Sequence, residues 1–236
     1  RIARRATEIA VFARMTDAAA EAARIWHEGE PGSMRALQAL VGLLISSNRF
    51  DEVLPYLKKM LASQGAGSAE GFTQLGRALA NVPDKQAALK LVTEVAGDYP
   101  GLLAARLAVA QAAAAAGDDA AALREVRRAR ELRPESEAAV LLEAQLVQRR
   151  SSAESLQVLE RYLDRYPGSR EVRLNYARAL LAEKRFGEAR NQFQRLVAAF
   201  PDNTEVIFSV ALLSLQLSDY ALAESHLQRL LDMDFR

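Results

Sequence analysis

The residues that could perform chemistry are few and far apart in this sequence. Its two histidines, His27 and His226, are separated by almost the whole chain of 236 residues. Neither stands in an H-E-x-x-H pattern, and no serine–histidine–acid set can be assembled around them. There is no cysteine to supply a thiolate nucleophile or a zinc ligand. We predict a surface or packing role for both histidines, no catalytic residue, no metal site and no cofactor.

Other polar stretches have simpler structural interpretations. The acid pair Asp118-Asp119 falls in a turn before a helix, where aspartate caps the helix N-terminus. Gly65 and Gly67 follow no strand pattern, which argues against a phosphate-binding loop. Arginines at 124–133 could bind phosphate or an acidic partner. We favour a solvated helix face, because glutamates are interleaved with them at ion-pairing spacing.

Composition indicates an all-α chain. Alanine accounts for 45 residues, about one in five, and aromatic residues for only 6%, which favours helices over strands.

The charge balance argues against two classes of partner. With 31 basic and 30 acidic side chains the net charge is +1, so no broad surface for nucleic acid or an anionic membrane is expected. No apolar run is long enough to span a bilayer.

Four prolines set a regular period along the chain. Pro100, Pro134, Pro167 and Pro201 are separated by 34, 33 and 34 residues, and Pro31 lies two periods and one residue before the first of them. A helical chain with this period is built from helix pairs, each ending near a proline. We predict seven such pairs, over about residues 1–33, 34–68, 69–102, 103–136, 137–169, 170–203 and 204–236.

Small apolar residues recur in phase with the prolines, at points where helices must approach closely. They are Gly76, Ala110, Ala177 and Ala211 in the first helices, and Ala88, Ala122, Ala189 and Ala223 in the second helices. This pattern resembles the tetratricopeptide repeat over the whole chain. The resemblance implies an all-α, right-handed superhelical solenoid, a single domain over residues 1–236, with a concave inner surface.

Two segments depart from the pattern. Segment 137–169 is one residue short, and we place the deletion in the turn at 149–152. Segment 34–68 carries Pro55 inside its second helix, where proline removes a backbone hydrogen bond and is expected to kink the helix. The following Ser-Gln-Gly-Ala-Gly-Ser stretch at 63–68 is the one candidate hinge.

The same resemblance suggests a binding groove. In tetratricopeptide proteins the groove is lined by the second, fifth, ninth and twelfth residues of each first helix. The ninth positions carry Arg77, Gln111, Gln145, Arg178 and Leu212, and the fifth carry Thr73, Leu107, Leu141, Leu174 and Phe208. Amide and guanidinium groups would pair with the backbone of an extended peptide, while the leucines take its apolar side chains.

An alternative stays open at this point, in which these leucines are core residues one step out of register. The asparagine and lysine set that clamps acidic chaperone C-termini is absent from these positions. Such a ligand is therefore disfavoured.

Four stretches resemble a narrower family. They lie at 3–10, 22–26, 173–181 and 205–215 and are similar to long tetratricopeptide lipoproteins of proteobacteria on the periplasmic side of the outer membrane. One member of that family is an adaptor for a carboxyl-terminal processing protease that degrades cell-wall hydrolases. The resemblance implies a non-catalytic, periplasmic, outer-membrane-associated adaptor whose partner is a protein or peptide, such as that protease or a hydrolase.

The first and last residues of the sequence lead to further predictions. The chain opens on a helical pattern without Met and closes on an apolar helix, so we expect a fragment of a longer protein whose targeting sequence lies outside it. We expect no membrane contact by this fragment. The alternative function is a structural module of a larger protein that self-associates through its apolar end helices.

Overall fold

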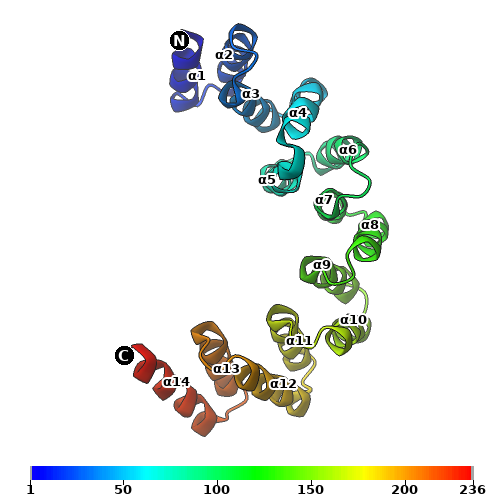
Figure 1. The fold of residues 1–236 in the computed structure, drawn as a ribbon, viewed down its shortest axis with the longest axis vertical. Coiled ribbons are helices and arrows are strands. Elements are labelled where there is room, and N and C mark those ends of the chain that lie inside the picture. Colours follow the sequence, from blue (N-terminus) through cyan, green and yellow to red (C-terminus); the bar gives the residue numbers. More distant parts are fainter. Residues whose placement is uncertain (1, 235–236) are drawn as a thin grey trace. The chain divides into compact units, whose positions relative to one another are not determined.

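The computed structural model describes residues 2–234, and all regular secondary structure in that range is helical (Figure 1). The predicted all-α fold of seven helix pairs is confirmed there. The helices are α1 (Ile2–Phe12), α2 (Thr16–Gly29), α3 (Met34–Ser46), α4 (Phe50–Gln64), the short 3-10 helix η1 (Gly65–Gly67), α5 (Ser68–Ala80), α6 (Lys85–Ala96), α7 (Leu103–Ala115), α8 (Asp119–Leu132), α9 (Glu137–Gln148), α10 (Ser152–Arg165), α11 (Arg170–Ala182), α12 (Phe186–Ala199), α13 (Thr204–Gln216) and α14 (Tyr220–Asp234).

The helices form two compact units, residues 1–134 and residues 135–236. The first unit holds α1 to α8 and the second holds α9 to α14. Within each unit a helix packs mainly against helices one or two positions away in chain order. The stacking of all the repeats into a single superhelix, and the handedness of that superhelix, stay predictions.

Capping residues explain where seven of the α-helices within residues 2–234 begin. The side chain of the cap accepts a hydrogen bond from the backbone N–H three residues later, which satisfies one of the amides that the first helical turn leaves unpaired. Asp118 caps α8 in this way, as predicted. The same arrangement occurs at Ser33, Asp84, Ser136, Ser151, Ser169 and Asn203.

The turns inside the pairs share one backbone feature. At the same point of five turns a residue adopts positive φ: Arg14, Asn48, Gly117, Lys184 and Ser218. Only at Gly117 is that residue a glycine, which takes this conformation without a steric cost. The turns at 81–84 and 149–151 have no such residue. The turn of the fifth pair has three residues, as in the neighbouring pairs, whereas α9 has 12 residues against 13 in α7, α11 and α13. The one-residue deletion that we placed in the turn therefore shortens α9 instead.

The predicted kink and hinge both lie around α4. Helix α4 is one element that runs through Pro55 to Gln64. Gly65–Gly67 then form the 3-10 helix η1, which leads directly into α5. The hydroxyl of Ser68 donates to the carbonyls of Leu61 and Gly65. The segment 63–68 is a hydrogen-bonded connection in this structure, and hinge motion there stays a prediction.

Small side chains lie where the helices cross, as predicted. All seven alanines of the predicted set are at most 3% exposed, and Gly76 is half-buried. Around them, large apolar side chains fill the core of each unit, with Leu40, Leu57 and Phe72 in the first and Leu180 and Leu196 in the second.

An ion-pair cluster joins α2 to α4 in the first unit. Arg49 donates to both oxygens of Glu52, at 2.6 and 2.8 Å, and to Glu21 at 2.7 Å. Arg24 also bonds to Glu52 and lies near Glu21. Hydrogen bonds from Arg49 and then Arg24 lower the pKa of Glu52 to about 2. The carboxylate therefore stabilises the fold only while it is ionised.

We predict that Glu52→Gln abolishes this pH-dependent contribution. Because the folded-state pKa lies below the ordinary carboxyl value, the stabilisation is complete above that value and is lost as the pH falls toward about 2. The melting temperature of the wild type should exceed that of Glu52→Gln at neutral pH, and the gap should close on acidification.

The exposed Arg4–Glu8 pair provides the control, because exposed pairs contribute little. The melting temperature of Glu8→Gln, followed by circular dichroism over the same pH series, should differ from that of the wild type by a small amount that hardly changes with pH. A difference in melting temperature between the wild type and Glu52→Gln that stays constant down to about pH 2 would contradict the prediction.

Candidate functional site

The predicted groove residues of the first unit lie on α5 and α7. Arg77 and Gln111 are exposed, and Leu107 is half-buried. Gln111 lies over Gly76, since a Cβ built on that glycine would be 3.5 Å from the Gln111 Oε1 atom. The structure thus places Gln111 beside the neighbouring first helix, whereas Arg77 and Leu107 do not line a cavity with it.

Beside Gln111 lies an apolar cavity of about 400 Å³. Helices α5, α6 and α7 form its walls. Gln111 and Lys85 are its polar residues, and the ammonium of Lys85 donates to the carbonyl of Ala80 at 2.7 Å. The other lining residues are Gly76, Leu79, Ala80, Ala88, Ala108, Ala112 and Ala115. A cavity of this shape can accept one apolar side chain, with the Gln111 amide at its edge for a backbone group.

The alanine run on α7 thus has two roles. Ala113 is fully buried and serves close helix packing. Ala112 and Ala115 instead line the cavity. The periodicity of a helix explains the difference, because adjacent residues point in directions about 100° apart.

In the second unit the predicted polar residues are open to solvent. Gln145 on α9 and Arg178 on α11 are exposed, and Leu141 and Leu174 are half-buried. Both leucines pack against the core of this unit. Each leucine therefore contributes part of its side chain to the core and leaves part accessible, and its role in a binding groove stays a prediction.

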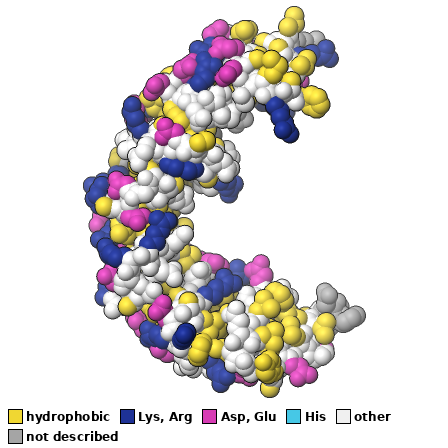
Figure 2. Space-filling model, turned by 180° about the vertical axis from the view of Figure 1, so that it is seen from behind, with side chains coloured by type: hydrophobic (Ala, Val, Ile, Leu, Met, Phe, Trp, Pro, Cys, Tyr) yellow, Lys and Arg dark blue, Asp and Glu magenta, His cyan; other side chains and the backbone are white. Residues whose placement is uncertain are grey.

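The most exposed apolar surface at predicted groove positions is on α13. Phe208 is 50% exposed, Leu212 46% and Leu215 41%. They stand at i, i+4 and i+7 and so share one face of the helix; we call this face the α13 stripe. Figure 2 shows hydrophobic side chains gathered over the C-terminal helices. Phe208 was selected from the sequence, whereas Leu215 was missed although it is the twelfth residue of the same helix.

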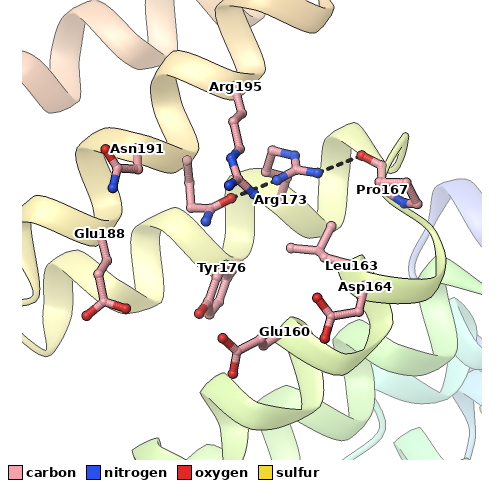
Figure 3. A pocket seen from close by; sticks show the side chains of 10 residues that line it. Glu160, Leu163, Asp164, Pro167, Arg173, Tyr176, Glu188, Asn191 and Arg195 are labelled. Carbon is pink, nitrogen blue, oxygen red and sulfur yellow. Dashed lines mark hydrogen bonds between the residues drawn. The ribbon is translucent and has the colours of Figure 1, made fainter.

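A second, polar cavity of about 430 Å³ was not foreseen from the sequence. It lies between α10, α11 and α12 (Figure 3). Its lining residues are Glu160, Leu163, Asp164, Pro167, Arg173, Tyr176, Glu188, Asn191, Gln192 and Arg195. Burial, followed by the charge of Glu160, raises the pKa of Tyr176. No motif marks these residues, and only a comparison between repeats reveals their significance.

The two histidines lie far apart in the chain. His27 is 6% exposed, with its Nε2 atom 3.3 Å from the Lys59 ammonium and its ring edge-on to Tyr56. Burial, followed by the charge of Lys59, lowers the pKa of His27. Burial, followed by the charge of Arg229, lowers the pKa of the half-buried His226. His27 therefore packs inside the first unit as a neutral ring.

Residues 2–234 contain neither a metal-binding cluster nor a membrane-spanning helix. No group of three or more His, Asp or Glu side chains in that range is arranged to hold a metal ion. Nor does that range contain a helix with both the length and the apolar character needed to cross a bilayer.

Comparison with known proteins supports the architecture. Residues 147–212 match the family model of the tetratricopeptide repeat. A tetratricopeptide repeat protein from Parabacteroides merdae superimposes with a TM-score of 0.51 at 14% identity, over 96% of this chain and 90% of that one. Residues 147–212 therefore match the tetratricopeptide repeat itself, and nearly the whole chain shares the fold of a tetratricopeptide repeat protein.

A further solved structure has the same fold. MamA from Desulfovibrio magneticus RS-1 (41-end) aligns with a TM-score of 0.50 at 16% identity, over 70% of this chain and 94% of that one. No curated protein matches the sequence significantly. At these identities the likeness concerns the fold, and the resemblance to protease adaptors rests on the sequence stretches alone.

We predict that the apolar cavity of the first unit can be filled without loss of stability. Ala112→Leu directs its added atoms into the cavity and should change the unfolding free energy by less than about 0.5 kcal/mol. Ala113→Leu, the matched control one residue along, overpacks the core and should cost about 1–3 kcal/mol. Urea unfolding followed by circular dichroism measures both, and equal losses for the two variants would mean that the cavity is closed.

Proposed function

We propose that this chain is a non-catalytic scaffold or adaptor that binds a partner protein or an extended peptide through its first helices. Tetratricopeptide repeats commonly serve protein–protein interaction and typically lack catalysis. The observation that carries the proposal is the α13 stripe, because three large apolar side chains at groove positions are 41–50% exposed. Exposed apolar side chains gathered on one face mark interaction sites.

The exposed polar residues supply the second half of the recognition. Gln145 and Arg178 in the second unit, and Arg77 and Gln111 in the first, are free to bond the main chain of a bound peptide. Apolar side chains of a bound peptide would contact the α13 stripe in the second unit or enter the cavity beside Gln111 in the first. Within each unit the apolar contacts would supply affinity, and the hydrogen bonds from the polar residues would orient the peptide.

The biological context that we propose is the envelope of a Gram-negative bacterium. The stretches at 3–10, 22–26, 173–181 and 205–215 support it through their resemblance to periplasmic, outer-membrane-associated lipoproteins. On this proposal the partner is a carboxyl-terminal processing protease or a cell-wall hydrolase. Fractionation of cells, followed by co-purification of the protein with the protease, tests both location and partner.

Self-association is the second candidate function, and exposed apolar residues on α1 and α14 favour it. Ile9 and Phe12 on α1 are 68% and 91% exposed, and Tyr220 and Leu231 on α14 are 67% and 53% exposed. Their faces could pair with a second copy of the chain.

We predict that charge reversal at the polar groove positions weakens peptide capture. Peptides selected from a displayed random library on the wild type should bind Arg178→Glu/Gln145→Glu at least about tenfold less tightly, because each change replaces a donor with an anion. The melting temperature should stay unchanged, since both side chains are exposed. Fluorescence polarisation with the selected peptides measures the affinity.

The control variant is Arg161→Glu/Gln194→Glu, which makes the same chemical changes at exposed positions on the second helices α10 and α12. It should bind as the wild type does. Equal affinity of all three proteins would refute binding through the first helices.

We predict that the chain is monomeric if it acts as an adaptor. Light scattering at increasing protein concentration should give the mass of one chain for the wild type and for Phe12→Ser/Leu231→Ser alike. A larger mass in the wild type that falls to the monomer in this variant would favour the self-association module instead.

A further inference from the structure

Two repeats carry an arginine four residues before the small crossing residue of their first helix, Ala110 or Ala177. These are Arg106 in α7 and Arg173 in α11. Each reaches back to the proline that ends the preceding repeat: Arg106 donates to the Pro100 carbonyl at 3.2 and 3.3 Å, and Arg173 to the Pro167 carbonyl at 2.6 Å. The two sites are equivalent in the repeat, so each serves as a reference for the other.

In the earlier repeat a carboxylate neutralises the arginine. Glu125 on α8 accepts from Arg106 at 2.9 Å through one oxygen and from Arg128 at 2.7 Å through the other. The Glu125 side chain is 13% exposed. Two guanidinium groups are thus held around one largely buried carboxylate.

In the later repeat the carboxylate is missing. Gln192 occupies the position of Glu125, and Arg195 that of Arg128. Arg173 donates to the amide oxygen of Gln192 at 2.7 Å, so both of its hydrogen-bond acceptors, this amide and the Pro167 carbonyl, are neutral. Within the described part of the chain, Arg195 has no hydrogen bond or ion pair. The later repeat keeps both cations and replaces their shared anion by an amide.

This leaves a buried cation without an anionic partner. Arg173 is only 7% exposed, and buried charges in proteins are normally paired. Burial, followed by the charge of Arg195, lowers the pKa of Arg173, and no carboxylate offsets this. An anion bound from solution or from a partner would offset both the burial of the Arg173 charge and its repulsion by Arg195.

The polar cavity gives such an anion access. Arg173, Gln192 and Arg195 line one part of it, and Glu160, Asp164 and Glu188 line another (Figure 3). Glu188 is already paired with Arg185 at 2.6 and 2.7 Å. The cavity therefore offers a cationic part and an acidic part that are not paired with each other.

We propose that this cavity binds a carboxylate of a partner peptide, an acidic side chain or a C-terminus, beside Gln192, where the carboxylate contacts Arg173 and Arg195 as Glu125 contacts Arg106 and Arg128 in the earlier repeat. A cationic group of the same peptide lies beside Glu160 and Asp164. The acidic residues disfavour a phosphate dianion, which concentrates more negative charge. Leu174 and Arg178 do not line the cavity, so this site is separate from the proposed groove contacts.

The experiment follows the Nε–H signals of the arginine side chains by NMR in the whole chain. The probes are acetate, inorganic phosphate and 6-aminohexanoate, which joins a carboxylate to an ammonium group. Sodium chloride keeps the ionic strength constant. We expect Arg173 and Arg195 to respond to acetate and more strongly to 6-aminohexanoate, with phosphate weaker than either.

Two reciprocal variants make the test specific. Gln192→Glu restores the internal carboxylate, so it should abolish the acetate response and raise the melting temperature by about 2–4 °C. Glu125→Gln should lower the melting temperature and create an acetate response at Arg106. Both variants convert one repeat into the arrangement that the other already adopts, so both are expected to fold.

Three results would overturn the proposal. One is the absence of an acetate response in the wild type, and another is an equal response in Gln192→Glu. A stronger response to phosphate than to acetate would overturn the carboxylate as ligand. Peptide capture by the groove variants is measured separately, so failure here leaves the proposed function standing.

Discussion

Close contact between helices at small side chains is the constraint on which the rest of the structure depends. A single helix pair has too little apolar surface to fold alone, and neighbouring pairs must bury it for one another. Alanine at the crossing points, such as Ala110, Ala177 and Ala211, lets the helices approach closely. Larger side chains such as Leu180 and Phe72 then fill the space between the crossings. The alanine excess of the sequence is a direct expression of this requirement.

Because the crossing points are fixed, chemical variety is confined to the positions between them. The same helix positions carry arginine, glutamine or leucine from one repeat to the next, and these are the positions that stay exposed. The two cavities show that a few substitutions at these positions are enough to give one repeat a different binding surface from another. One is lined largely by alanines, and in the other Gln192 stands where an earlier repeat has Glu125.

The fold followed from the sequence because its signals are local and repeated. The proline period located every helix pair, and the small residues located the crossings. The sites were harder to predict because they depend on contacts between helices. Leu141 and Leu174 divide their side chains between the core and the surface, which a register argument cannot resolve. Arg173 and Gln192 meet only once α11 and α12 are packed, so neither residue is distinctive in the sequence.

The packing of each helix against helices one or two positions away also governs how the chain reaches this structure. Contacts of short sequence separation require only small loops to close, so the entropy lost before stabilising contacts form is small. Local N-caps such as Asp118 and Ser169 fix where helices begin without help from distant segments. Each repeat can therefore take its final structure soon after its own residues and those of its neighbour are available. Such a chain is suited to folding progressively while it is being synthesised, from the first pair toward the last.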